Sequence, residues 1–265
     1  MRLAYNQVPE VGYWWLDGYI DLNSQQSPRV RDELARLLAW HRTNELPKYT
    51  ATLQKAQDLL PNAVTAQQVC AVYDELRAHV DTAINKALPT MADMALTLSP
   101  EQIEHLRAKY KKNNDEYVRE YLKGSEQDRA GRRLKQAISR SESVYGSLDE
   151  VQIAAIKLAL KRSSVDAAMF QKERERRQKE ALELLSSLVA TQPSPAATQT
   201  QLRSYFNRSF TSPDPVYRAY AAKTTQQSCE FFAIVHATTT PAQRAKAVQT
   251  LQGYTADLQV LSAQK

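Results

Sequence analysis

The sequence has 265 residues and a formal net charge of +6, a length that supports one large domain or two ordinary ones without a metal or a disulfide. It holds only six glycines and is dominated by residues that favour helices, and no Val or Ile residues alternate with polar ones over the length of a strand. No run reaches the roughly 18 to 20 apolar residues of a membrane-spanning helix. We therefore expect an all-α fold, a bundle of amphipathic helices, with neither a β-sheet nor a membrane span.

An aromatic segment, YWWLDGYID at residues 13–21, lies near the N-terminus and holds two of the three tryptophans. Aromatic side chains at this density most often belong to a core. Trp14, Trp15 and Tyr19 also suit a surface that contacts a glycan, a peptide or a membrane interface, because each side chain combines an apolar ring with a polar group that can contact water. These three residues are therefore candidates for a binding surface.

Two carboxylates in the same segment, Asp17 and Asp21, are four residues apart. On a helix they would share one face, where they would suit an acid/base pair or two oxygen ligands for a cation. Against this, Gly18 favours the end of a helix, no further ligand is visible, and Asp21 also suits a helix cap.

Helix starts are marked by capping boxes, in which a Ser, Thr or Asp side chain and a Gln three residues later satisfy each other's backbone N–H groups. Two boxes also place a proline at the first helical position, and two further starts are expected at Ser27-Pro28 and Asp214-Pro215. Apolar residues at steps of three and four follow, as in residues 69–87. The boxes are Thr65 with Gln68, Ser99 with Gln102, Asp149 with Gln152, and Thr240 with Gln243.

Two long helices are expected in the middle of the chain. Residues 149–189 contain neither Gly nor Pro and predict a single helix. Residues 100–145 predict a second one, with weak points at Gly124 and Gly131. The two would pair as a long helical hairpin over about residues 100–189.

A linker is expected at residues 191–200, because this stretch combines two prolines with small polar residues. It would separate an N-terminal helical region, residues 1–190, from C-terminal helices over residues 201–265. We expect these parts to pack together as one domain.

The positive charge is concentrated in residues 101–180, which hold 19 Lys and Arg against 14 Asp and Glu. Such a surface attracts anionic lipid headgroups, glycan phosphates, nucleic acid or acidic unfolded chains, although a solvated helix face has the same composition. The candidate binding residues in this region are Arg132, Arg133, Lys135 and Arg140.

Residues 172–180 mix both signs of charge, and Glu173 stands three and four residues before Arg176 and Arg177. These local pairs favour a solvated face of a long helix. The segment has no interleaved aromatic residues and no helix-turn-helix pattern, so we expect no nucleic-acid partner.

The two cysteines, Cys70 and Cys229, allow two interpretations that depend on the compartment. In the cytosol both would be small buried apolar residues. In an oxidising compartment they would bridge early and late helices and close a loop whose constraint is worth about 4 to 5 kcal/mol. The sequence leaves both open.

The chain shows no pattern of a common enzyme. Its histidines, His41, His79, His105 and His236, lie on different expected helices without zinc-ligand spacing. A glycine-rich phosphate loop and a nucleophile elbow are both absent from the sequence. We therefore expect no metal, no cofactor and no catalytic residues.

Four N-terminal segments are similar to an uncharacterised family of proteobacterial lipoproteins. They are RLAYNQVP at residues 2–9, YWWLDGY at 13–19, PRVR at 28–31 and WHR at 40–42. The resemblance implies a periplasm-facing position at the cell envelope, in the outer membrane, where a lipidated cysteine would precede this sequence. It implies no activity.

Three helix starts resemble the Leu-Thr-x-x-Gln boxes of Spy and CpxP, which are small periplasmic helical chaperones. They are LSPEQ at residues 98–102, LDEVQ at 148–152 and TTPAQ at 239–243. Helix capping alone also explains these boxes. The chain departs from that family in its length and in its aromatic N-terminal segment.

Together these features predict a non-enzymatic, periplasm-facing lipoprotein that binds an envelope component or unfolded chains, with a Spy-like activity. The alternative is a structural or scaffold subunit of an envelope complex, in which the aromatic segment seats against a partner protein. An enzyme that uses Asp17 and Asp21 is a third hypothesis.

Overall fold

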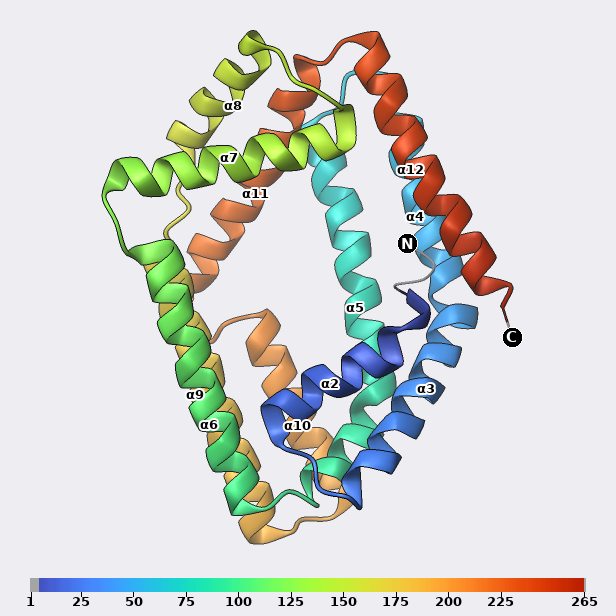
Figure 1. Cartoon of the computed structure of the whole chain (residues 1–265), viewed down its shortest axis with the longest axis vertical. Helices are drawn as coiled ribbons and strands as arrows, with labels where there is room; N and C mark the ends of the chain where they lie inside the picture. The colour runs from blue at the N-terminus through green and yellow to red at the C-terminus, as the bar shows by residue number, and fades with distance from the viewer. Residues whose placement is uncertain (1–4, 265) are drawn as a thin grey trace. The chain divides into compact units, whose positions relative to one another are not determined.

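The computed structural model describes residues 5–264, and the regular structure of this part of the chain is all helical (Figure 1). It contains α-helices and a π-helical turn but no β-strand, which confirms the all-α fold class. None of the described helices combines the length and the apolar character that crossing a membrane requires. The elements are α2 (Val8–Ile20), α3 (Gln26–Asn44), α4 (Leu46–Leu59), α5 (Ala66–Ala95), α6 (Pro100–Tyr117), η1 (Val118–Leu122), α7 (Glu126–Tyr145), α8 (Glu150–Arg162), α9 (Ala167–Thr191), α10 (Pro195–Phe210), α11 (Pro215–Ala237) and α12 (Pro241–Ser262).

Contacts along the backbone divide the chain into two compact units. Unit 1 consists of Met1–His41, Asp81–Leu122 and Ala167–Arg218, and unit 2 consists of Arg42–Val80, Lys123–Asp166 and Ala219–Lys265. Helices α3, α5 and α11 each contribute residues to both units. This division differs from the expected regions 1–190 and 201–265, because each unit combines segments that are far apart in the sequence.

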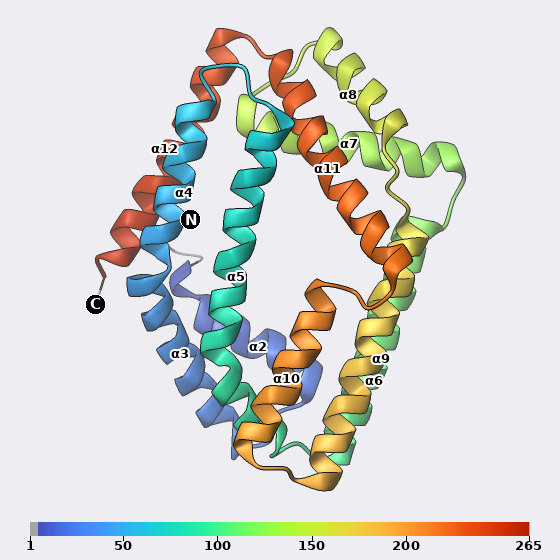
Figure 2. The same cartoon turned by 180° about the vertical axis from the view of Figure 1, so that it is seen from behind.

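Unit 1 is built around α6 and α9, which lie side by side and run in opposite directions (Figures 1 and 2). Helix α2 packs against α6, and α10 packs against α9. One buried cluster contains Leu106 of α6 and Leu182 of α9. A second contains Ala92 of α5 and Leu188 of α9. These two clusters fix the helices on which the candidate sites of unit 1 lie.

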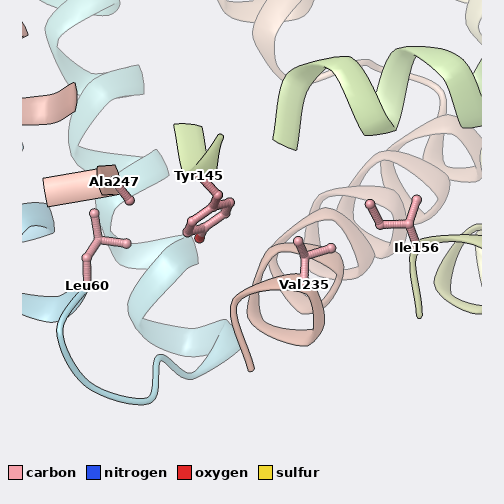
Figure 3. Close-up of a cluster of buried hydrophobic side chains, with 5 residues drawn as sticks. All are labelled: Leu60, Tyr145, Ile156, Val235 and Ala247. Atoms are coloured by element: carbon pink, nitrogen blue, oxygen red, sulfur yellow. The ribbon is translucent and has the colours of Figure 1, made fainter. Parts of the chain in front are cut away.

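Unit 2 packs α12 along α4, and α7 against both α8 and α12. Its core takes one side chain from each of α7, α8, α11 and α12 and one from the turn that follows α4, as Figure 3 shows for Leu60, Tyr145, Ile156, Val235 and Ala247. Cys70 of α5 and Cys229 of α11 form a disulfide within this unit, with their Cα atoms 5.5 Å apart. The bridge joins positions separated by 159 residues.

The predicted hairpin over residues 100–189 does not consist of two continuous helices, and its first helix breaks at Gly124, one of the two expected weak points. Helix α6 continues only as η1, after which Gly124 adopts a left-handed φ of 93° and Ser125 caps α7. A left-handed φ favours glycine and ends the helix there. Helices α6 and α9 do pack antiparallel, but residues 123–166 between them belong to unit 2.

The single helix predicted over residues 149–189 is also broken, between α8 and α9. There the backbone N–H of Ser164 donates to Gln227 at 2.8 Å, and that of Asp166 donates to the Tyr220 hydroxyl at 2.9 Å. These long-range partners replace the hydrogen bonds that would continue the helix. A segment without Gly or Pro is therefore not necessarily one continuous helix.

Most of the predicted linker, residues 191–200, is helical. Only Gln192–Ser194 separates α9 from α10. Pro195 occupies the first turn of α10, where it loses no hydrogen bond, and the Ser194 hydroxyl accepts from the N–H of Ala197 at 3.3 Å. The prolines thus mark a helix start and not a domain boundary.

The helix start predicted at Ser27 and Pro28 is displaced, because Asn23 caps α3. Its side-chain oxygen accepts from the N–H of Gln26 at 2.9 Å, and Gln26 Oε1 accepts from the N–H of Asn23 at 3.1 Å. The Ser27 hydroxyl instead donates to the Asn23 carbonyl at 2.8 Å. Asn with Gln three residues later is therefore a capping box beyond the four predicted ones, and Ser125 with Asp128 forms another at the start of α7.

The boxes that start α3 and α6 are joined in unit 1 through their glutamines. Gln26 Nε2 donates to Gln102 Oε1 at 3.2 Å, and Gln102 Nε2 donates to Gln26 Oε1 at 2.7 Å. Each amide also donates to a backbone carbonyl just before the other box, at Thr97 (2.9 Å) and Asp21 (2.8 Å). The pair therefore ties two helix starts together.

The boxes that start α8 and α12 are joined in the same way in unit 2. Gln152 Nε2 donates to Gln243 Oε1 at 2.6 Å, and Gln243 Nε2 donates to Gln152 Oε1 at 3.0 Å. The amides also donate to the carbonyls of Thr238 (3.0 Å) and Ser147 (2.9 Å). The same arrangement thus occurs once in each unit.

Candidate functional site

The outer face of α2 is apolar and exposed. Val11, Trp14 and Trp15 are 62%, 64% and 59% exposed, and Val8 is exposed beside them. Val8, Val11 and Trp15 follow helical steps of three and four, so they line one face. An exposed cluster of large apolar side chains of this kind typically marks a site of interaction.

The inner side of α2 is fixed by Tyr13, which is buried. The Tyr13 hydroxyl donates to the Ser27 hydroxyl at 3.1 Å. The guanidinium of Arg31 lies 3.6 Å from the centre of the Tyr13 ring and 5.6 Å from that of Trp14, and it also pairs with Glu10. Trp14 is therefore held beside a cation while its surface stays exposed.

Tyr19, at the other end of α2, is half-buried against α6. Its hydroxyl accepts a hydrogen bond from Asn113 Nδ2 at 2.7 Å, and its ring lies 6.2 Å from Tyr110. The ring of Trp15 lies 4.6 Å from that of Tyr19. Of the three predicted aromatic residues, Trp14 and Trp15 form the surface and Tyr19 supports it.

Asp17 and Asp21 do not share a helical face, because α2 ends at Ile20 and Asp21 takes a left-handed φ of 57°. Asp17 Oδ1 accepts from the N–H of Leu22 at 3.0 Å, so this carboxylate stabilises the turn after the helix. The backbone carbonyl of Asp21 accepts from Gln102. The geometry gives both aspartates a structural role at the end of α2.

The predicted basic residues are exposed on α7, in unit 2, whereas the aromatic residues lie in unit 1. Arg132 donates to the carbonyl of Lys123 at 2.9 Å, and Arg133 donates to that of Val165 at 3.4 Å. Both arginines thus hold neighbouring loops. The two exposed residues Lys135 and Arg140 complete the set.

The histidines are dispersed, and no group of three or more metal-ligating side chains occurs within residues 5–264. His236 is fully buried between the Tyr145 hydroxyl (2.9 Å) and the Asn62 carbonyl (2.8 Å). His79 lies 3.5 Å from the Glu45 carboxylate, and His41 lies 2.8 Å from the Tyr5 hydroxyl. The fourth, His105, is exposed.

Unit 1 contains a small cavity that was not predicted from the sequence. Its volume is about 140 Å³, and its walls are mainly apolar. Five residues of α9 line it together with one tyrosine from α10 and one from α11: Phe170, Glu173, Arg174, Arg177, Gln178, Tyr205 and Tyr217. The charged segment 172–180 is therefore not a wholly solvated face.

The carboxylate of Glu173 lies at the buried side of this charged face, and the residue is only 4% exposed. Its carboxylate accepts hydrogen bonds from Nε and Nη2 of Arg176 and Nε of Arg177, each at 2.9 Å, and from the Ser212 hydroxyl at 3.1 Å. Burial alone would raise the pKa of Glu173, but these donors hold that pKa below its usual value. The carboxylate is therefore ionised at neutral pH.

Residues 18–209 match the family described as "Family of unknown function (DUF6279)", and this range is more than half of the chain. It includes the helices α3 to α9 and all but the last residue of α10, and with them the α9 and α10 residues of the cavity. It starts just after Trp14 and Trp15. No curated protein and no solved structure matches the chain. The chain therefore belongs to the DUF6279 family.

Proposed function

We propose that this protein is a non-catalytic binding protein of the cell envelope that holds apolar segments of unfolded polypeptide chains on the outer face of α2. The observation that carries the proposal is the exposure of Val8, Val11, Trp14 and Trp15 on one helix that is itself firmly packed. Rigid aromatic side chains supply a large contact area at low entropic cost, which suits partners of varied sequence.

The charge of α2 favours a polypeptide over an anionic membrane surface. The helix carries two carboxylates, Glu10 and Asp17, and neither Lys nor Arg. Interfacial helices that bind anionic lipids are instead rich in basic residues on their polar face. A folded envelope partner that seats on the same face, as in a scaffold subunit, is the alternative.

The envelope location rests on two features. The N-terminal segments resemble proteobacterial lipoproteins, and the Cys70 to Cys229 disulfide is typical of oxidising compartments. We propose that the native protein is tethered by a lipid that precedes this sequence. The capping boxes that resemble those of Spy and CpxP tie helix starts together within the fold, so they carry no argument for a chaperone activity.

Location is tested by mass analysis under non-reducing conditions, with thiol labelling, of the protein exported in its native host with its own leader. We expect a lipidated N-terminus and no labelled thiol. An unlipidated protein with two labelled thiols would overturn the envelope location.

Client binding is tested with urea-unfolded malate dehydrogenase, which is diluted into buffer while its aggregation is followed by light scattering. We expect the full chain to suppress aggregation, and a variant with Trp14→Ser and Trp15→Ser to lose this effect. The matched control replaces two exposed tyrosines of unit 2, Tyr73 and Tyr254, with Ser.

The control variant is expected to suppress aggregation as the unmodified chain does. Equal suppression by both variants would mean that α2 is not the binding face. Absence of suppression, together with one stoichiometric partner that co-purifies only when the tryptophans are present, would replace the chaperone-like proposal with the scaffold subunit.

A further inference from the structure

The cavity beside α9 is built by one face of a single helix. Phe170, Glu173, Arg174, Arg177 and Gln178 follow steps of three and four residues, so their side chains share one side of α9. Tyr205 of α10 and Tyr217 of α11 complete the walls. All of these residues belong to unit 1, so the cavity is complete within one unit.

The cavity is lined by more positive than negative charge, with two arginines and one glutamate. The one lining carboxylate, Glu173, already accepts four hydrogen bonds. Arg177 donates to it through Nε alone, and neither Nη atom of Arg177 has a hydrogen-bond partner within residues 5–264. Arg174 has no ion pair in the same part of the chain and lies 5.5 Å from the centre of the Tyr117 ring. Two guanidinium groups therefore offer unused donors.

These arginines are held in place before any ligand arrives. Arg177 is fixed by Glu173 and lies 5.8 Å from the centre of the Tyr217 ring. Arg174 is placed by the ring of Tyr117. Positioned guanidinium groups bind carboxylates through paired N–H donors, and little side-chain entropy is lost when they are already ordered.

The remaining walls suit an apolar group. Phe170, Tyr205 and Tyr217 supply three aromatic rings. The Tyr205 hydroxyl donates to the Arg177 carbonyl at 3.4 Å, and burial raises the pKa of Tyr205, so the phenol stays neutral. A cavity of about 150 Å³ accepts benzene, and the volume here, about 140 Å³, is close to that.

We propose that this cavity binds an aromatic ring whose short aliphatic side chain carries a carboxylate, with Arg174 and Arg177 holding the carboxylate and the three aromatic side chains lining the place of the ring. Such a group is found at the C-terminus of a polypeptide that ends in an aromatic residue and in free aromatic acids. The proposal does not depend on α2, because none of the lining residues belongs to that helix.

The experiment is a titration calorimetry series on the full chain with N-acetylphenylalanine, phenylacetate and, as the neutral match, N-acetylphenylalanine amide. We expect the acids to bind at least about tenfold more tightly than the amide, since a hydrogen bond to a charged group contributes about 1.5 to 3 kcal/mol. Tight binding of N-acetylphenylalanine alone identifies a polypeptide C-terminus, and similar binding of both acids identifies a free acid.

Arg174→Gln is expected to weaken binding of the acids at least about tenfold. The matched control is Lys179→Gln, which removes the same charge from an exposed position of α9 outside the cavity and should leave binding unchanged. Phe170→Ala is a second test, because Phe170 is 46% exposed and its loss leaves the core intact. It should weaken binding of the aromatic group.

The proposal is overturned if neither acid binds, if the amide binds as tightly as the acids, or if inorganic phosphate competes with the acids equally well. Unchanged affinity in both the Arg174 and the Phe170 variant overturns it as well. The variant without Trp14 and Trp15 is expected to bind the acids normally, which separates this site from the face of α2.

Discussion

Gln152 and Gln243 donate hydrogen bonds to each other's side-chain oxygens, at 2.6 and 3.0 Å, while each also closes its own capping box. Gln26 and Gln102 repeat this arrangement in unit 1. Each glutamine thus satisfies its own helix start and a backbone carbonyl beside the other start. A motif that is local in sequence becomes a long-range connection in the fold.

Replacing Gln152 with Ala is expected to lower the free energy of unfolding by about 1 to 3 kcal/mol, because it leaves buried donors and acceptors without partners. Gln243→Ala should act similarly, and the two effects should not add, because the residues share hydrogen bonds. A double-mutant cycle measured by urea unfolding checks this. The control is Gln68→Ala in the exposed box at Thr65, which should cost less. Additive effects would contradict the coupling.

Ile156→Ala is expected to destabilise the protein by about 3 kcal/mol, since Ile156 is fully buried in the core of unit 2 and its loss leaves a cavity. Val151→Ala on the same helix should change the free energy of unfolding by less than about 0.5 kcal/mol, because Val151 is 73% exposed. Urea unfolding followed by circular dichroism measures both. Equal effects would mean that α8 does not bury Ile156.

The disulfide is expected to stabilise unit 2 by about 4 to 5 kcal/mol, because it constrains a loop that spans 159 positions in the unfolded chain. The measurement compares the urea midpoint of the oxidised protein with that of a Cys70→Ala, Cys229→Ala variant. A reducing agent should lower the midpoint of the unmodified protein and leave that of the variant unchanged. A midpoint insensitive to reduction would show that the bridge does not form.

The buried His236 predicts a loss of stability in mild acid. Burial lowers the pKa of His236, against the hydrogen bond to the Asn62 carbonyl, which raises it, and the nearby Arg244 lowers it further. The unfolded chain therefore takes up a proton at a higher pH than the folded protein does. The free energy of unfolding should fall as the pH drops through about 6.5, the ordinary pKa of histidine.

Urea unfolding on both sides of that pH measures the effect. The difference should be smaller in His236→Gln, which cannot take up the proton. An equally large pH dependence in the variant would assign the effect to other groups.

Helix starts were predictable where the signal is local. The boxes at Ser99, Asp149 and Thr240 each close within four residues, and the structure has all three. The break between α8 and α9 was not predictable, because it depends on Gln227 and Tyr220, which are more than 50 residues away. Sequence reasoning could therefore find the ends that a cap defines but not those that tertiary contacts impose.

The candidate sites divide in the same way. The aromatic density of residues 13–21 suited either a core or a binding surface, and the structure decides between them, because Tyr13 is buried while Trp14 and Trp15 are exposed. The cavity was not predicted, because in the sequence Glu173 resembles any other charged residue of a solvated helix, and its partner Ser212 is 39 residues away. The sequence feature that could have indicated it is the spacing of aromatic and basic residues from Phe170 to Gln178.

Both units include a late segment of the chain, Ala167–Arg218 in unit 1 and Ala219–Lys265 in unit 2. A chain that emerges from a ribosome or an export channel therefore lacks part of each unit until Arg218 has appeared. Helices made earlier remain with apolar faces uncovered until then, as α6 does until Leu182 of α9 can pack against Leu106. Such transiently exposed apolar surface is what holding factors recognise in nascent proteins. Completion of this fold is thus a late step of biogenesis, and a product truncated before Arg218 contains neither unit whole.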